Sequence, residues 1–215
     1  MTMSSPQVLG RGLVARLVRG LLAGSITAAL ITAYTSINFF FYFTILSNVL
    51  AAILMLALAI RPNWVGTLAT PRGAVTLYMT ITGIVYATLL RPIEADVGLV
   101  EPWINWVLHS LGPTAVLIDW LLFPPDRRLS TTSLWLWLVV PAAFLVVTLI
   151  RGPIVGFYPY PFLDPREIGY GGVAVYSVGI LLLFLLVGVF LRWWGNERGQ
   201  ALAQRMHEPG SRLQA

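Results

Sequence analysis

The sequence contains no cysteine and no lysine, and only 11% of its 215 residues are charged. The absence of cysteine excludes disulfide bonds, thiolate metal ligands and a cysteine nucleophile. A soluble domain carries roughly 25% charged residues, so this chain has too few to cover a surface exposed to water. Because 57% of the residues are hydrophobic, we expect an all-α polytopic membrane protein.

Several well-known catalytic motifs are also missing. The sequence has no G-x-S-x-G elbow, no H-E-x-x-H zinc motif and no Walker A phosphate loop. Its two histidines, His109 and His207, are too few for the paired axial ligands of a membrane cytochrome b or for the usual zinc site. We therefore expect no metal and no other cofactor.

The basic residues are all arginines, fourteen in number, and the formal net charge is +5. They gather at the ends of the apolar stretches, where arginine anchors a helix and sets its orientation. This placement indicates membrane anchoring and argues against a nucleic-acid partner.

Six apolar stretches are long enough to span a membrane, which takes about 20 residues. Short connections join them, so we expect a single transmembrane domain over residues 1–194 and a polar cytoplasmic tail over residues 195–215. His207 lies in that tail, where we expect it to be solvated. The expected spans are residues 13–35, 38–60, 73–91, 103–123, 133–151 and 170–194.

The arginine distribution predicts the orientation of these spans. If the N-terminus is cytoplasmic, only Arg91, Arg151 and Arg166 fall on the outer side. Because cytoplasmic segments carry the excess of basic residues, we expect both termini in the cytoplasm. The cytoplasmic arginines are then Arg11, Arg16, Arg19, Arg61, Arg72, Arg127, Arg128, Arg192, Arg198, Arg205 and Arg212.

Polar side chains interrupt two of the expected spans at the same estimated depth. At 1.5 Å per residue, Thr44 and His109 each lie about 9 Å below the outer end of their own spans. Ser47 and Asn48 share a helix face with Thr44, because residues three and four apart are neighbours on a helix. Polar residues inside a membrane are costly, so this match in depth indicates a functional site.

A hydroxyl that faces an imidazole supplies a nucleophile and its base. Threonine is a weak nucleophile unless a base takes its proton, and the titration range of histidine suits that task. We interpret Thr44 as the nucleophile and His109 as the base, with Ser47 as the alternative nucleophile. Asn48 would orient the imidazole or donate a hydrogen bond to an oxyanion.

Asp119 is the only acidic residue within the expected spans. It lies about 15 Å deeper than His109 along the same helix, which is too far for a Ser-His-Asp relay. We expect a structural ion pair with Arg127, Arg128 or a neighbouring helix. If an acidic side chain orients His109, the candidates nearer to its depth are Glu94, Asp96 and Asp164 from the outer loops.

The outer loop before the last span, residues 157–165, contains three prolines and four aromatic residues. Proline stiffens the backbone, and aromatic rings favour the membrane interface. The loop is therefore expected to act as an interfacial plug or as a lid over the site, and the sequence leaves both open.

Three sequence elements in one order resemble the androgen-induced gene / androgen-dependent TFPI-regulating protein family of multi-pass membrane hydrolases, including its bacterial branch. They are F-T-x-x-S-N at residues 43–48, H-x-x-x-P at residues 109–113 and Y-P-Y-x-F-L at residues 158–163. The resemblance implies hydrolysis of fatty acid esters of hydroxy fatty acids, with Thr44 as nucleophile and His109 as its histidine partner. It also implies a bacterial inner or plasma membrane.

On this hypothesis a lipid ester enters from the outer leaflet, and Asn48 or Tyr158 holds the oxyanion. Two other classes of function stay open. The protein would bind or transport a lipid without chemistry, or it would be a scaffold in which hydroxyl groups only bond to their own helix or to a neighbour.

Overall fold

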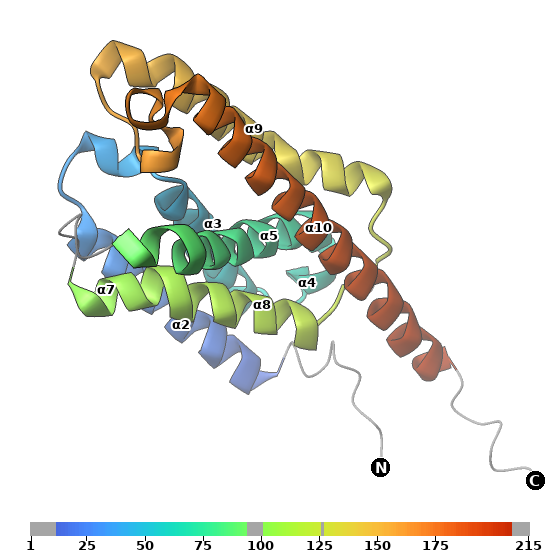
Figure 1. Ribbon diagram of the computed structural model, residues 1–215. Helices are drawn as coiled ribbons and strands as arrows, with labels where there is room; N and C mark the ends of the chain where they lie inside the picture. The colour runs from blue at the N-terminus through green and yellow to red at the C-terminus, as the bar shows by residue number, and fades with distance from the viewer. Residues whose placement is uncertain (1–11, 94–100, 126, 208–215) are drawn as a thin grey trace, which may run out of the picture.

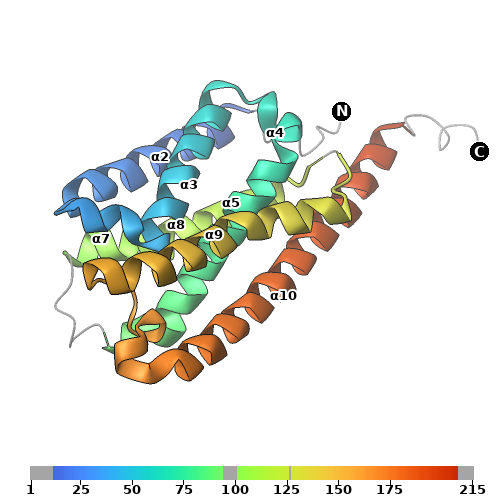
Figure 2. The ribbon, with the colours of Figure 1, turned by 90° about the horizontal axis from the view of Figure 1, so that it is seen from above.

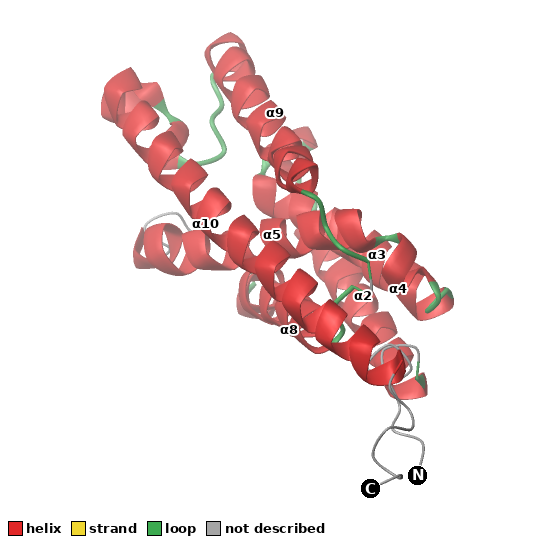
Figure 3. Ribbon diagram, turned by 90° about the vertical axis from the view of Figure 1, so that its right-hand side faces the viewer, coloured by secondary structure: helices red, strands yellow, loops and turns green. Residues whose placement is uncertain are grey.

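The computed structural model describes residues 12–93, 101–125 and 127–207, and the regular structure within these ranges is entirely helical (Figures 1 and 3). In chain order the elements are α2 (Leu13–Ala33), the 3₁₀ turn η1 (Ile37–Phe41), α3 (Phe43–Ile60), α4 (Trp64–Thr67), α5 (Ala69–Val85) with its π-helical extension η2 (Tyr86–Leu90), the 3₁₀ turn η3 (Arg91–Ile93), α7 (Pro102–Trp106), the π-helical η4 (Val107–Leu111), α8 (Gly112–Leu122), α9 (Thr131–Val155), the 3₁₀ turn η5 (Pro161–Leu163) and α10 (Pro165–His207).

Five helical segments in the described part of the chain are long and apolar enough to cross a membrane, which fits a helical membrane protein. The remaining expected span is also helical, because α7, η4 and α8 follow one another without a gap from Pro102 to Leu122. Asn105, His109 and Asp119 lower the hydropathy of that segment, and it is not one of the five. The sixth span and the orientation therefore stay predictions.

Two helix starts show how local sequence sets the element boundaries. The second expected span begins as the 3₁₀ turn η1, and α3 starts only at Phe43. Thr44 therefore lies in the first turn of α3 and not six residues into a helix, as the sequence suggested. In α10, Gly169 has a non-helical backbone with φ 68°, a conformation that glycine adopts without steric cost, so the long helix proper begins near the expected residue 170.

The expected boundary at residue 194 does not mark the end of the packed bundle. Helix α10 continues to His207, and Gly195 lies close to the Trp120 ring. The buried side chain of Asn196 accepts a hydrogen bond from the N–H of Leu129 and donates one to its carbonyl oxygen. The first residues of the expected tail thus hold the α8–α9 connection against α10.

Helix α10 runs along one edge of the molecule, opposite the edge formed by α2 (Figure 2). In the most apolar window of α9 and of α10, 17% of the residues are buried, against 56% in α3. The polar groups of α3 are therefore the ones that must find partners within the protein.

Pro141 removes one backbone hydrogen bond from the interior of α9, and a side chain of α5 replaces it. A proline has no N–H to donate to the carbonyl oxygen four residues earlier, which here belongs to Trp137. The buried Tyr78 hydroxyl donates to that oxygen instead, at 2.8 Å. The Trp137 ring lies so close to Gly73 that a Cβ there would approach it within 2.1 Å, so α5 and α9 pack tightly.

A buried ion cluster joins α2, α5 and α8. Arg19 Nε lies 2.7 Å from Asp119 Oδ1, and Arg72 Nη2 lies 3.2 Å from Asp119 Oδ2. Both arginine side chains are 1% exposed, so the carboxylate compensates charges that would otherwise be buried alone. Asp119 thus pairs with arginines of two neighbouring helices, which confirms one of our alternatives. The predicted pairing with Arg127 or Arg128 is wrong.

Candidate active site

Thr44 and His109 meet inside the bundle. The Thr44 hydroxyl oxygen Oγ1 lies 3.3 Å from His109 Nε2. Thr44 is buried in the first turn of α3, and His109 is half-buried in η4. The match in depth that we estimated from the sequence therefore corresponds to a direct contact.

The contact of the second ring nitrogen of His109 selects the tautomer of the neutral imidazole. His109 Nδ1 lies 3.2 Å from the backbone oxygen of Asn105. A carbonyl oxygen only accepts hydrogen bonds, so Nδ1 carries the proton in this contact. The neutral imidazole then presents the Nε2 lone pair to the Thr44 hydroxyl, as a general base requires.

Tyr86 supports this orientation of the imidazole. Its ring stacks on the His109 ring with a centroid distance of 4.2 Å and an interplanar angle of 23°. The Tyr86 hydroxyl also accepts a 2.7 Å hydrogen bond from the Asn105 side chain. An aromatic face and a backbone oxygen thus orient His109.

No acidic side chain that we considered as an orienting partner of His109 contacts it among the described residues. Asp164 binds Arg166, with 2.9 Å between Arg166 Nε and Asp164 Oδ1. Glu94 and Asp96 lie outside the described residues.

Asn48 ties the start of α3 to the η4 segment that carries His109. In the π-helical η4, each N–H bonds five residues back, as Gly112 does to Val107. Pro113 follows and has no N–H, so this pattern provides no backbone donor for the Leu108 oxygen. The Asn48 side chain donates to it at 3.0 Å, and to the Thr44 backbone oxygen at 2.8 Å.

Asn48 is therefore a positioning residue. We predicted that it orients the imidazole directly or donates to an oxyanion, but its amide N–H groups are directed to two backbone oxygens. Its effect on His109 is exerted through the backbone of η4. The H-x-x-x-P element requires such a donor, because the proline removes the backbone N–H that would bond to Leu108.

The Ser47 hydroxyl does not contact His109 as the Thr44 hydroxyl does. Its hydroxyl donates to the Thr44 backbone oxygen at 3.0 Å and lies 3.0 Å from the Thr82 hydroxyl. The hydroxyl that contacts the imidazole is that of Thr44.

Tyr160 belongs to the site, although the sequence did not single it out. Its hydroxyl accepts a 3.1 Å hydrogen bond from the Thr44 backbone N–H and lies 3.3 Å from Thr44 Oγ1. The ring is buried and stacks on Phe162 at 5.1 Å. Burial raises the pKa of the Tyr160 phenol above its ordinary value of 10.0, so the hydroxyl keeps its proton at neutral pH.

Tyr158, which we expected as an oxyanion donor, lies elsewhere. Its ring packs so closely on Gly152 that a Cβ there would lie 2.1 Å from it. The Arg166 guanidinium lies 5.1 Å from the centre of the same ring. The sequence gives no reason to choose between the two tyrosines of the Y-P-Y element as members of the site. The fold places Tyr160 at Thr44 and Tyr158 against α9.

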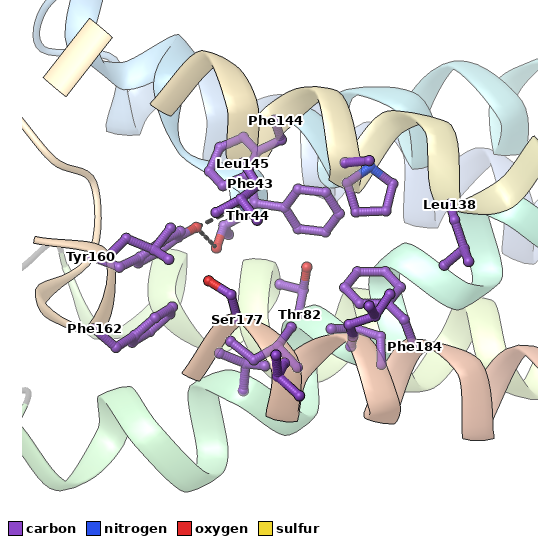
Figure 4. Close-up of a pocket in the computed structure, with 18 of the residues that line it drawn as sticks. Phe43, Thr44, Thr82, Leu138, Phe144, Leu145, Tyr160, Phe162, Ser177 and Phe184 are labelled. Atoms are coloured by element: carbon purple, nitrogen blue, oxygen red, sulfur yellow. Dashed lines mark hydrogen bonds between the residues drawn. The ribbon is translucent and has the colours of Figure 1, made fainter. Parts of the chain in front are cut away.

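A cavity of about 360 Å³ opens beside Thr44 (Figure 4). This lies within the range of ligand pockets, roughly 300–1,000 Å³. Residues of the 157–165 loop form one of its walls. The apolar lining includes Phe43, Ile81, Leu138, Phe144, Phe162 and Phe184, and the polar lining consists of Thr44, Thr82, Tyr160 and Ser177.

Comparison with known proteins adds no family to these observations. No family model, no curated protein and no solved structure matches the chain. Among the described residues, no group of three or more histidine, cysteine or acidic side chains could hold a metal ion.

Proposed function

We propose that this protein is an integral membrane hydrolase of lipid esters, with Thr44 as the nucleophile and His109 as the general base. The observation that carries the proposal is the 3.3 Å contact between Thr44 Oγ1 and His109 Nε2, beside an apolar cavity that Thr44 lines. A cavity of this kind suits an acyl chain, and the contact provides the proton transfer that a hydroxyl nucleophile needs.

In the first half of the reaction, His109 Nε2 takes the Thr44 proton while Oγ1 attacks the ester carbonyl carbon. Negative charge develops on the carbonyl oxygen. The Thr44 N–H, which is one of the N–H groups without a partner in its own helix, and the Tyr160 hydroxyl are the donors nearest to it. The partial positive charge at the start of α3 adds to their effect.

In the second half, His109 gives its proton to the alkoxy oxygen, and the alcohol leaves an acyl-threonine. A water molecule then transfers a proton to His109 and attacks the acyl carbon. Collapse of this intermediate releases the fatty acid and returns the proton to Thr44. No cofactor is needed for either half.

The proposed substrates are fatty acid esters of hydroxy fatty acids or similar lipids. The three sequence elements that resemble the family of membrane hydrolases support this class, together with the apolar cavity walls. The substrate would enter from the outer leaflet of a bacterial inner or plasma membrane, with both termini of the protein in the cytoplasm.

A second function, lipid binding or transport without catalysis, is favoured by the same apolar lining of the cavity. It predicts that His109 variants still bind lipid and that no acyl-threonine forms. The two functions therefore differ in a measurable covalent intermediate.

The test is hydrolysis of a fatty acid ester of a hydroxy fatty acid by purified protein in detergent. Wild type is compared with Thr44→Ala, His109→Ala and Ser47→Ala, all checked for unchanged thermal stability. We expect both Thr44→Ala and His109→Ala to lose activity, Ser47→Ala to retain it, and mass spectrometry to detect an acyl group on Thr44. Stable wild-type protein that hydrolyses no member of a panel of lipid esters would favour lipid binding instead.

A further inference from the structure

One hydroxyl group in the cavity wall differs from most helical hydroxyls in this protein. Serine and threonine in apolar helices commonly bond back to a carbonyl oxygen three or four residues earlier. Several do so here, at 2.7–2.9 Å: Ser25 to Leu22, Thr32 to Ala28, Thr80 to Thr76 and Thr88 to Ile84.

Ser177, in α10, does not follow this pattern. Its hydroxyl oxygen is buried and has no hydrogen-bond partner among the described residues. The residue lines the cavity, and Figure 4 shows the hydroxyl directed into it, towards the side where Thr44 and Tyr160 lie. A buried polar group without a partner destabilises the fold, so its presence in a ligand cavity indicates that it serves the ligand.

The other polar groups of the cavity wall are already engaged. Thr44 and Tyr160 contact each other, and the Thr82 hydroxyl lies 3.0 Å from that of Ser47. The proposed hydrolysis assigns the Thr44 N–H and the Tyr160 hydroxyl to the carbonyl oxygen of the ester, so Ser177 is the hydroxyl of the described lining left for another polar atom of the bound molecule.

The chemistry of an ester specifies which atom this is. An ester has two oxygens, and its carbonyl oxygen would lie at the Thr44 N–H and the Tyr160 hydroxyl. The remaining oxygen is the alkoxy oxygen, on which negative charge develops as the bond to the carbonyl carbon breaks.

We propose that Ser177 donates a hydrogen bond to the alkoxy oxygen of the lipid ester held at Thr44, and that it is a specificity-determining residue. The inference rests on the proposed hydrolysis of lipid esters. Ser177 selects lipids that carry an oxygen between two apolar arms, while His109 remains the group that protonates the leaving alcohol.

A binding experiment tests this without requiring turnover. The probes are a long-chain dialkyl ether, which keeps the alkoxy oxygen and cannot be hydrolysed, and the alkane of the same length. Both are titrated into purified wild type, Ser177→Ala and the control Ser25→Ala, in detergent. We expect wild type and Ser25→Ala to bind the ether about fivefold more tightly than the alkane, and Ser177→Ala to show no preference.

A kinetic experiment separates this inference from the proposed function. Sulfur is a weak hydrogen-bond acceptor, so Ser177→Ala should lower kcat/KM about tenfold for an oxygen ester and leave it nearly unchanged for the matching thioester. Its melting temperature should not fall, because the removed hydroxyl has no partner in the described protein.

The outcomes are distinct. If wild type hydrolyses esters and Ser177→Ala shows neither the binding nor the kinetic effect, the role of Ser177 is overturned and the hydrolase proposal stands. If wild type hydrolyses no ester, and the preference for the ether is present and lost in Ser177→Ala, the hydrolase proposal fails and Ser177 remains a ligand-binding residue. Equal binding of ether and alkane by wild type overturns the role of Ser177 in either case.

Discussion

Two buried polar clusters lie in this apolar bundle, and they are built differently. The ion cluster of Arg19, Arg72 and Asp119 joins three helices through charged groups, with N···O distances of 2.7 and 3.2 Å. The site cluster of Thr44, His109 and Tyr160 uses neutral groups at 3.1–3.3 Å and borders a cavity.

The difference reflects what each cluster can do. Buried charges need compensation, so their partners are held firmly and removal of any one of them is costly. In the site cluster the Thr44 hydroxyl lies within reach of two neutral partners, and hydrogen bonds of this length commonly shorten when substrate binds. The first arrangement stabilises a fold, whereas the second allows a proton to move.

The largest effect should follow from removing either member of the proposed catalytic pair, Thr44 and His109. We expect Thr44→Ala and His109→Ala each to lower kcat/KM about 10³-fold, and the double variant to lose no more than either single one, because the residues act as a unit. Steady-state kinetics on the same ester measures all three. Losses that multiply in the double variant would show that the two residues act independently.

Removal of the carboxylate from the ion cluster should affect stability instead. Asp119→Asn leaves Arg19 and Arg72 without their compensating charge, so we expect a loss of about 3–5 kcal/mol in the free energy of unfolding. Denaturant unfolding in detergent measures it. The triple variant Arg19→Met, Arg72→Met, Asp119→Leu should recover much of this loss, because no buried charge remains. Wild-type stability in Asp119→Asn would contradict the structural role.

A smaller effect on activity should come from the tyrosine of the site cluster. Tyr160→Phe removes one proposed oxyanion donor and should lower kcat about 10²-fold with little change in KM. The matched control is Tyr158→Phe, from the same Y-P-Y element, which should keep wild-type kcat. Equal losses in the two variants would argue for a general effect on the loop and against a specific one on the oxyanion.

The smallest effect concerns an ion pair whose arginine is exposed, between Arg166 and Asp164. Hydrogen bonds from Arg166 lower the pKa of Asp164 below its ordinary value of 3.8. The pair therefore stabilises the fold above that pH, and its contribution is lost as the pH falls through the lowered pKa. Because the Arg166 side chain is 57% exposed, we expect Asp164→Asn to cost at most roughly 1 kcal/mol at neutral pH.

Melting curves of wild type and Asp164→Asn between pH 3 and 7 measure this contribution. The difference between the two proteins should shrink below about pH 4. A difference as large as that of Asp119→Asn would remove the contrast between a carboxylate paired with two buried arginines and one paired with an exposed arginine.

The helices, and the meeting of Thr44 with His109, were predictable from the sequence. Long apolar stretches form membrane-type helices because backbone groups in lipid must bond within their own segment. The constant helical rise then converts residue number into depth. Whether the chain crosses the membrane six times, and in which direction, stays a prediction.

The partners of Asp119 and the tyrosine that reaches Thr44 could be assigned only from the fold. Asp119 has arginines nearby in the sequence, yet Arg19 and Arg72 are its partners because α2 and α5 pack against α8. Tyr160 enters the site because the 157–165 loop returns to the start of α3, while Tyr158 packs against α9. Sequence spacing does not encode either choice.

The sequence by itself determined the helical, apolar class of the protein and placed Thr44 and His109 at matching levels of their helices, because both follow from local composition and from a regular rise per residue. Only the tertiary structure decided which polar groups touch. Contacts between distant segments depend on how helices pack side by side and on which backbone oxygens proline leaves without a donor, and these are properties of the assembled bundle.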